Sequence, residues 1–184
     1  GARVQEMPNS FDCIIVGGGG AGLAAAYSAA CQGATVALLE RRPQPGGTTG
    51  IAVGSFTAAG TRWQQRAGID DNPEDHDEDV SLFADPELEA RNNQPLRRFF
   101  LEHAAETLHW LQEELRLNYV GPSPEPPNRC PRMHNVVPGA KAYVVRFQLA
   151  LRRRGATIIT GAAVTRLLQE NGRISGVEFS QDGK

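Results

Sequence analysis

Residues 11–22 read FDCIIVGGGGAG, a short apolar run followed at once by four glycines. Branched residues dominate Phe11 to Val16, which is typical of a buried β-strand. Leu23 to Cys31 is rich in alanine, the strongest helix former. Thr35 to Leu39 is a second β-prone run. The stretch therefore predicts a strand, a crossover helix and a parallel second strand, the unit from which Rossmann-like α/β folds are built.

The glycines match the fingerprint of dinucleotide-binding folds. Gly17 would make the tight turn, Gly19 would let the backbone approach a pyrophosphate, and Gly22 would let the helix pack closely on the strand. The free amides at the start of the helix would hold the phosphates. Glu40 ends the next strand, where a carboxylate can bind ribose hydroxyls. In this context we interpret the glycines as a dinucleotide site and not as a flexible loop.

Composition excludes several classes of protein. The 184 residues are 40% hydrophobic, enough for one domain with a real core. With 19 basic and 21 acidic residues the formal charge is −2, so nucleic acid is not an expected partner. The sequence predicts no membrane span, and three irregularly spaced cysteines favour a reducing cytoplasm over a disulfide framework or a zinc site.

The middle of the chain predicts helices and one long loop. A helix should open at Asn72-Pro73 and run towards Leu82, and another should open at Pro95. The apolar residues of the second helix recur at helical spacing and predict one buried stripe. Its members are Leu96, Phe99, Phe100, His103, Ala104, Leu108, Leu111 and Leu115. Gly121 to Pro138 holds six prolines and is expected to be a loop.

The last third predicts a helix over about Lys141–Arg154 and then β-structure. Strands are expected at 157–160, 164–168 and 174–179, the last two joined by a turn at Asn171-Gly172, which together make a small antiparallel meander. Asp182-Gly183 is a further turn signal and predicts a return strand after Lys184. Residues 1–10 are interpreted as an N-terminal arm or a cloning remnant, and residues 11–184 as a truncated dinucleotide-binding domain.

The segment Gly46-Gly47-Thr48-Thr49, followed by 52–61, resembles the flavoprotein family of fumarate reductase and succinate dehydrogenase, which includes ketosteroid dehydrogenases and urocanate reductases. The resemblance continues through residues 68–72, through the helix around Trp110, through 131–134 and through 155–177. It covers nearly the whole chain from Phe11 onward, and it implies FAD as the cofactor.

The resemblance also implies roles for single residues. It places Ala21 and Gly22 at the pyrophosphate, Glu40 at the ribose and Arg41 near the adenine. It places Gly46 and Gly47 in the segment that passes under the flavin and its pyrophosphate, Thr48 and Thr49 near the ribityl chain and the flavin ring, Gly54 beneath the flavin ring, and the backbone of Val164 on the adenine.

Two positions depart from the family pattern. Val53 and Ser55 stand where the family often has smaller residues, so local flavin contacts can differ. Thr48 stands where succinate dehydrogenases carry the histidine that attaches the flavin covalently. We therefore expect non-covalent FAD.

Other polar residues leave alternatives open. His134 and Arg132 could meet a substrate carboxylate or could only brace the chain. His76 lies among acidic residues, which we interpret as a solvated helix face and not as a metal site. Cys13 is expected in a buried strand, and Cys130 is expected to be the most exposed cysteine. No metal is expected, and no catalytic residue is assigned.

The expected chemistry is hydride transfer between FAD and a C–C bond next to a carbonyl or carboxylate of a small molecule, with an electron-donor partner left open. The family's substrate-binding residues, cap domain and second flavin segment would lie beyond Lys184. Two alternatives stay open: a binding module that is inactive by itself, and a flavoprotein of another class, such as a monooxygenase or an amine oxidase.

Overall fold

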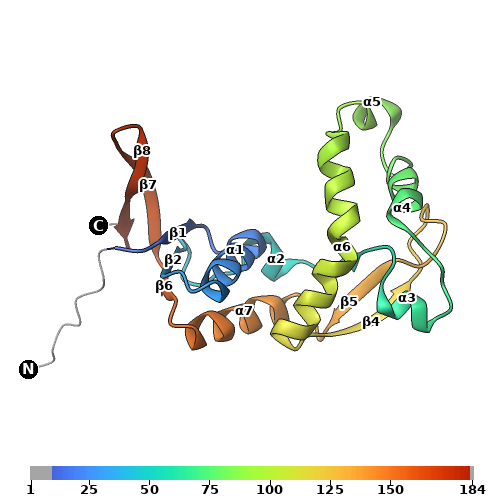
Figure 1. Cartoon of the computed structure of the whole chain (residues 1–184), viewed down its shortest axis with the longest axis horizontal. Helices are drawn as coiled ribbons and strands as arrows, with labels where there is room; N and C mark the ends of the chain where they lie inside the picture. Colours follow the sequence, from blue (N-terminus) through green and yellow to red (C-terminus); the bar gives the residue numbers. More distant parts are fainter. Residues whose placement is uncertain (1–9, 183–184) are drawn as a thin grey trace, which may run out of the picture. The chain divides into compact units, whose positions relative to one another are not determined.

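The computed structural model describes residues 10–182, which divide into two compact units. Unit 1 holds the residues up to Ile51 and those from Tyr143 onward, and unit 2 is Ala52–Ala142. Figure 1 follows the chain through both units by colour. Because each unit has its own fold, they are described separately.

Unit 1 is built on a parallel sheet with strand order β1-β2-β6. The strands are β1 (Cys13–Val16), β2 (Val36–Leu39) and β6 (Thr157–Ile159), and Cys13 lies opposite Val36. Helix α1 (Gly20–Cys31) crosses from β1 to β2. The predicted parallel α/β unit with its crossover helix is confirmed, and its edge strand β6 comes from far along the chain (Figure 1).

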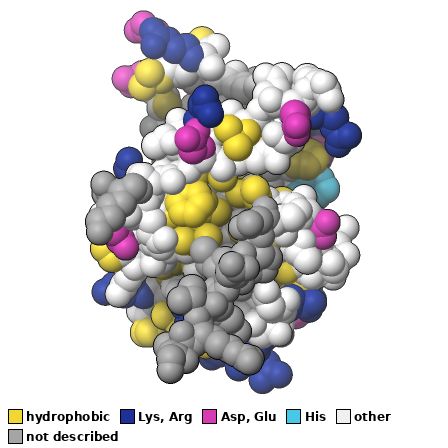
Figure 2. All heavy atoms as spheres, turned by 90° about the vertical axis from the view of Figure 1, so that its left-hand side faces the viewer, with side chains coloured by type: hydrophobic (Ala, Val, Ile, Leu, Met, Phe, Trp, Pro, Cys, Tyr) yellow, Lys and Arg dark blue, Asp and Glu magenta, His cyan; other side chains and the backbone are white. Residues whose placement is uncertain are grey.

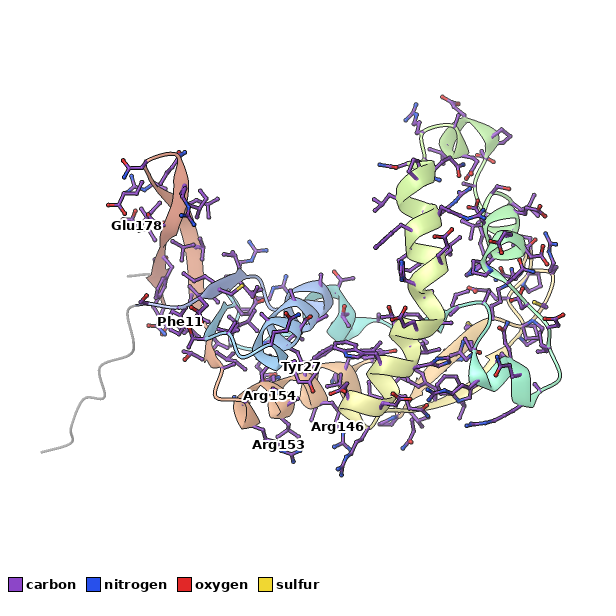
Figure 3. The ribbon with its side chains drawn as sticks, viewed as in Figure 1. Phe11, Tyr27, Arg146, Arg153, Arg154 and Glu178 are labelled. Atoms are coloured by element: carbon purple, nitrogen blue, oxygen red, sulfur yellow. The ribbon has the colours of Figure 1, made fainter. Side chains whose placement is uncertain are left out.

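The core of unit 1 lies around β2, whose four residues are all buried. From α1, Leu23, Ala26 and Tyr27 are buried. The Tyr27 ring meets Phe147 of helix α7 (Lys141–Arg153) edge to face, with 6.2 Å between ring centres. The Arg154 guanidinium lies 5.5 Å from the centre of the Tyr27 ring, and Figure 3 shows the two side chains together. This cation–π contact gives the end of α7 a packing role in addition to its effect on the helix dipole.

The final strands form an antiparallel hairpin of β7 (Ala162–Glu170) and β8 (Arg173–Gln181). Asn171 and Gly172 join them with φ of 50° and 77°, the conformation that the predicted turn requires. The predicted antiparallel structure is confirmed, and the strand at 157–159 joins the parallel sheet instead. Figure 2 shows a group of hydrophobic side chains near the centre of one face, with charged side chains mostly around it. Gly183 and Lys184, part of the predicted turn to a return strand, lie outside the described residues.

Unit 2 contains an antiparallel sheet with strand order β3-β5-β4. Its strands are β3 (Ser55–Thr57), β4 (Asn118–Ser123) and β5 (Met133–Val137). The prediction that Gly121 to Pro138 is all loop is therefore wrong. A register shift between Val120 and Ser123 removes Pro122 from the regular ladder, which is how a strand tolerates a residue without an N–H.

Unit 2 also contains the helices α3 (Arg62–Arg66), α4 (Pro73–Val80), α5 (Pro86–Glu89) and α6 (Gln94–Leu115). The predicted cap of α4 is confirmed, because the Asn72 side chain accepts a hydrogen bond from the backbone N–H of Asp75. The N-terminus of α3 is fixed by a capping box between Thr61 and Gln64, which the sequence analysis did not anticipate.

Helix α6 has two apolar faces, so the prediction of one buried stripe is wrong for its first half. Leu101, Ala104, Leu108, Leu111 and Leu115 are buried. In contrast, Leu96 is 62% exposed, Phe99 61% and Phe100 58%. At about 100° per residue, the exposed set is centred roughly a quarter-turn away from the buried set. The sequence prediction counted all apolar positions at helical spacing together and so did not separate the two faces.

Candidate functional site

The glycine turn after β1 has a geometry that only glycine can adopt. Gly17 has a φ of 100°, in the left-handed region that side chains disfavour. A Cβ on Gly22 would overlap the carbonyl oxygen of Gly17, so α1 could not approach the end of β1 with any larger residue there. The strand-to-helix turn that the sequence predicted is present.

At the N-terminus of α1, the space beside Gly19 is open. Gly19 is the N-cap, with ordinary φ of −75°, and a Cβ built on it meets nothing within 4 Å. The first amides of a helix have no acceptor within the helix, and the helix dipole adds partial positive charge there. The turn therefore offers N–H donors and room for an anionic group.

The second glycine segment lies directly against the first. The Gly46 amide donates to the Gly18 carbonyl at 2.8 Å, and Gly19 and Gly46 form a parallel bridge. A Cβ on Gly47 would lie 3.2 Å from the Cα of Gly19. The short helix α2 (Gly47–Ile51) starts at this contact. Two segments that the sequence analysis singled out separately thus form one glycine-lined wall.

Glu40 ties the glycine turn to the chain that follows β2. It is 7% exposed, and its two carboxylate oxygens accept hydrogen bonds from different backbone amides. Oε2 accepts from Gly18 at 2.8 Å, and Oε1 accepts from Arg42 at 2.9 Å. Each carboxylate oxygen can accept a further bond, so a ribose hydroxyl can still be bound. Glu40 therefore shapes the glycine turn in addition to any contact with a ligand.

These features surround a cavity of about 450 Å³ in unit 1. Six residues predicted for the cofactor line it: Gly17, Glu40, Arg41, Gly47, Thr48 and Val164. Its other lining residues carry no sequence motif: Val16, Leu39, Arg42, Ile51, Ala162 and Ala163. Ala162 and Ala163 open β7, and no local signal shows that this strand passes the end of β2.

The remaining predicted residues lie beside the cavity or in the other unit. Gly19, Gly46 and Thr49 belong to the glycine-lined wall, and Ala21 is exposed in the first turn of α1. Gly54 belongs to unit 2, where it has φ of 96° and a Cβ would lie 2.6 Å from Val136. Close packing against Val136 therefore requires glycine at position 54, and the place of Gly54 beneath a flavin stays a prediction.

Arg132 and His134 are buried within unit 2. Arg132 is 0% exposed and makes a bidentate pair with Asp71 at 2.7 and 2.9 Å and a third bond to Asp79 at 2.6 Å. His134 is 0% exposed, with Nε2 2.8 Å from the Thr61 hydroxyl and Nδ1 3.1 Å from the Phe56 carbonyl. Of the two alternatives, bracing the chain is the one that fits this burial.

The expectation of a solvated acidic face on α4 is wrong for its inner side. His76 is 2% exposed and Asp79 3%, because Arg129 and Arg132 neutralise the carboxylates there. Burial lowers the pKa of His76 to about 4, and the positive charge of Arg132 adds to the effect. No local sequence pattern predicts this burial, because the two arginines lie some fifty residues further along the chain.

Within residues 10–182, no group of three or more His, Cys, Asp and Glu side chains could hold a metal ion. The most exposed cysteine is Cys31 and not Cys130, which corrects the prediction. Burial and the Asp71 carboxylate raise the pKa of the Cys130 thiol to about 11, so it is not an activated nucleophile. No helix of this part of the chain is long and apolar enough to cross a membrane.

The chain is similar in sequence to known proteins that bind a dinucleotide cofactor. Residues 12–184 match the family described as FAD binding domain. The chain is 34% identical to the NADH:fumarate oxidoreductase of Klebsiella pneumoniae over 98% of its own length and 19% of the relative's. It is 35% identical to the cytochrome-type fumarate reductase of Shewanella frigidimarina over 60% of the chain and 19% of that protein. The chain thus spans about a fifth of these relatives.

Solved structures show a similar fold. A 3-ketosteroid-Δ4-(5α)-dehydrogenase from Rhodococcus jostii matches 99% of this chain and 44% of its own with a TM-score of 0.80 at 23% identity. An open form of a flavocytochrome c3 fumarate reductase matches 94% of this chain and 32% of its own with a TM-score of 0.79 at 24% identity.

Proposed function

The chain belongs to the FAD binding domain family, with FAD as its cofactor, and on this premise we propose that unit 1 holds the ADP half of a non-covalently bound FAD for an oxidoreductase. The single observation that carries the proposal is the cavity of about 450 Å³ bounded by the glycine turn, Glu40 and Thr48. Gly17, which leads into α1, and the buried Glu40 carboxylate both line it, and the N-terminus of α1 follows directly after Gly17.

The residues present fit the chemistry of the ADP group. The open space at Gly19 and the first amides of α1, including those of Ala21 and Gly22, suit a pyrophosphate. Glu40 suits the ribose hydroxyls, because its oxygens retain lone pairs after binding Gly18 and Arg42. Val164 and Arg41 line the cavity where an adenine would lie against β7 and the end of β2.

The flavin half requires more than this cavity. Thr48 and Thr49 follow the glycine-lined wall, and we propose that they meet the ribityl chain. Because Thr48 has no imidazole, it cannot form the histidyl bond that attaches the flavin covalently in succinate dehydrogenases. Gly54 is proposed to lie beneath the flavin ring. FAD, when bound, supplies hydride transfer, and this chain supplies binding and orientation.

The proposed reaction is hydride transfer between FAD and a C–C bond next to a carbonyl or carboxylate. The names of similar proteins support it: NADH:fumarate oxidoreductase, 3-oxosteroid 1-dehydrogenase and urocanate reductase. The partners would be a small-molecule substrate and an electron donor, and the cysteine content favours the cytoplasm. Among the described residues, none is assigned to proton transfer, since His134 and Arg132 are buried in structural contacts.

Two experiments test the proposal. The holoprotein is precipitated with acid, and flavin absorbance is measured in the supernatant and in the pellet. Release of all flavin as FAD is expected, whereas flavin that stays with the precipitated chain would contradict the role given to Thr48. A purified full-length enzyme that contains this chain should reduce fumarate, urocanate or the enone of a 3-ketosteroid when an artificial electron donor is supplied. Oxygen-dependent hydroxylation or amine oxidation in place of this activity would favour another flavoprotein class.

A further inference from the structure

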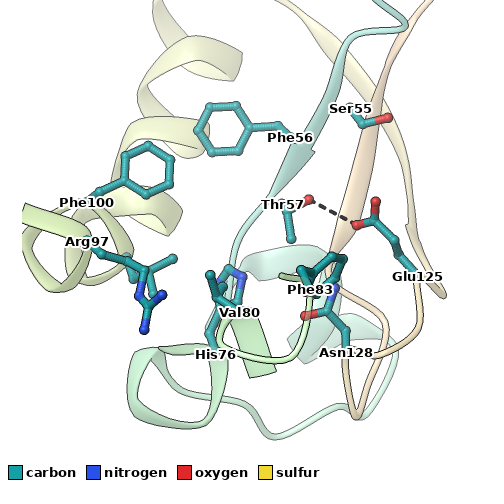
Figure 4. Close-up of a pocket in the computed structure, with 11 residues that line it drawn as sticks. Ser55, Phe56, Thr57, His76, Val80, Phe83, Arg97, Phe100, Glu125 and Asn128 are labelled. Carbon is teal, nitrogen blue, oxygen red and sulfur yellow. Dashed lines mark hydrogen bonds between the residues drawn. The ribbon is translucent and has the colours of Figure 1, made fainter. Parts of the chain in front are cut away.

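Unit 2 contains a second cavity, of about 510 Å³, within the range of about 300–1,000 Å³ that small-molecule sites occupy. Figure 4 shows its lining. The apolar part consists of Phe56 on β3, Val80 on α4, Phe83 after α4, and Phe100 and Leu101 on α6. Phe83 is 50% exposed and Phe100 58%, so the rim is open to solvent. All the lining residues belong to unit 2.

Two of the residues that line the cavity each have a buried polar atom that lacks a hydrogen-bond partner within the described residues. These atoms are Nδ1 of His76 and Nδ2 of Asn128. His76 is 2% exposed, and its pKa of about 4 keeps the ring neutral at physiological pH. The Asn128 side chain has its Oδ1 fixed by the Arg132 guanidinium at 2.9 Å, which leaves its amide nitrogen for another partner. A buried polar group without a partner costs roughly 1–3 kcal/mol, so both atoms call for a ligand or for water.

The charged lining groups limit what can fill the cavity. The Arg97 guanidinium is already paired with Asp77 at 2.6 Å and with Glu89 at 2.7 Å. The Glu125 carboxylate accepts a long 3.5 Å bond from the Thr57 hydroxyl, shown as a dashed line in Figure 4. Among the described residues that line the cavity, none is therefore an unpaired cation that could bind an anionic ligand, and the Glu125 carboxylate would repel such a ligand.

We propose that this cavity binds an uncharged, mostly apolar small molecule that presents a carbonyl or hydroxyl oxygen to Asn128 and His76. The aromatic walls contact the apolar body of the ligand, and the amide Nδ2 of Asn128 donates to its carbonyl oxygen. A ligand hydroxyl can donate to the Glu125 carboxylate. Isolated waters could satisfy the two polar atoms, but they would leave the aromatic walls wetted, which is unfavourable.

This site is independent of the proposed function. The FAD proposal rests on unit 1, and carboxylates such as fumarate are the molecules that Glu125 disfavours. Loss of FAD binding would leave this proposal intact, and absence of a ligand here would leave the FAD proposal intact.

The test is a titration of the full chain with 4-hydroxyacetophenone, a neutral aromatic with a carbonyl and a hydroxyl group, followed by calorimetry and by ligand-observed NMR. We expect saturable binding of one molecule per chain. Its anionic counterpart, 4-hydroxybenzoate, should bind at least about tenfold more weakly because it brings a second carboxylate near Glu125.

Variants locate the binding. Val80→Trp fills the cavity and should abolish binding. Asn128→Asp keeps the oxygen that accepts from Arg132 and removes the donor, so affinity should fall about tenfold. The matched control is Val120→Trp, a change to a residue of β4 that is 57% exposed and is not part of the lining. Circular dichroism and the thermal midpoint show which variants are folded.

Three outcomes would overturn the proposal. The first is no saturable binding of either probe by the folded chain. The second is binding that survives both Val80→Trp and Asn128→Asp when these variants are folded. The third is equal affinity for the neutral and the anionic probe, since that would show a site of different chemistry. Retained binding in Val120→Trp, with loss in the two cavity variants, is the result expected.

Discussion

At the scale of single residues, the glycines of unit 1 have separable roles. Gly22 is required because a side chain would collide with the backbone at Gly17, whereas Gly19 has free space and an unstrained backbone. Gly22 is thus needed for the fold, and Gly19 leaves room for a ligand. Sequence alone identifies both, because the fingerprint is local, but only the structure separates the two requirements.

Substituting these two glycines should therefore affect different properties: stability for Gly22 and FAD binding for Gly19. Gly22→Ala should lower the free energy of unfolding by about 1–3 kcal/mol or more, because the added methyl group overpacks the turn. Gly19→Ala should leave stability nearly unchanged and weaken FAD binding, because its methyl group occupies pyrophosphate space. Urea unfolding and flavin fluorescence titration measure the two quantities.

The control for this pair is Gly176→Ala on β8, where the nearest side-chain atom would lie at an ordinary 3.8 Å. It should change neither quantity. A Gly19→Ala variant that binds FAD as tightly as wild type would contradict the place assigned to the pyrophosphate.

Glu40 is predicted to have two roles, one in holding the glycine turn and one in binding FAD. Glu40→Ala removes the acceptor for both the Gly18 and Arg42 amides and a ligand of the ribose, so FAD affinity should fall roughly tenfold or more. Glu40→Gln keeps one acceptor oxygen and should be less affected. The measurement is the FAD dissociation constant. The control, Glu178→Ala, removes an exposed pair with Arg166 on the hairpin, and FAD affinity equal to that of Glu40→Ala would refute the specific role.

At the scale of elements, α4 is joined to β5 by buried charges. Asp71, which precedes α4, and Asp79 within it both bind Arg132, which directly precedes β5. Burial alone would raise the pKa of Asp71, but hydrogen bonds from Arg132 and Gln64 outweigh it and lower the pKa to about 2. The network therefore stabilises the fold only while its carboxylates are ionised.

Acid should destabilise unit 2 in two separate pH ranges. The pKa of His76 in the folded chain is about 4, below its ordinary value of 6.5. As the pH falls, His76 is therefore protonated in the unfolded chain before it is protonated in the folded chain, and the free energy of unfolding falls between pH 6.5 and 4. The loss is about 3 kcal/mol at most. Asp71 has a depressed pKa, so its contribution is present above pH 3.8 and is lost as the pH falls towards 2.

The two ranges can be tested by urea unfolding as a function of pH. His76→Phe should flatten the curve between pH 6.5 and 4, and Asp71→Asn should act on the lower range. Burial also lowers the pKa values of His109 and His134, so part of the upper slope should persist in the His76 variant. A wild-type curve that is flat from pH 6.5 to 4 would contradict the burial of His76 in its neutral form.

The elements show where sequence reasoning succeeds. The strand, turn and helix at 13–31, the hairpin turn at Asn171-Gly172 and the cap at Asn72 were predictable because each depends on neighbouring residues. The pairing of β3 and β4 with β5 was missed because it joins segments up to about eighty residues apart, and prolines concealed the strand pattern. The burial of Arg132 and His134 depends on the same distant pairing.

At the scale of the whole molecule, the chain consists of two units and spans about a fifth of its curated relatives. The cavity of unit 1 suits the ADP half of FAD, and none of the described residues is assigned to substrate binding or to proton transfer.

The isolated chain loaded with FAD should therefore show no saturable turnover of fumarate, urocanate or a 3-ketosteroid with an artificial electron carrier. A bound flavin would be open to water, and no group would orient the substrate. The measurement is steady-state rate against free FAD as the control. Saturable turnover above that control would show that catalytic residues lie within this chain, and it would reopen the roles of His134 and Arg132.

Titration of the purified apoprotein with FAD and with NAD shows whether unit 1 binds FAD through the glycine turn and Glu40. The readouts are quenching of flavin fluorescence for FAD and calorimetry for both nucleotides. We predict saturable binding of one FAD per chain, much weaker binding of NAD, and lower FAD affinity in Gly19→Ala than in Gly176→Ala. No saturable FAD binding by the folded protein, or equal FAD affinity in the two glycine variants, would contradict the claim.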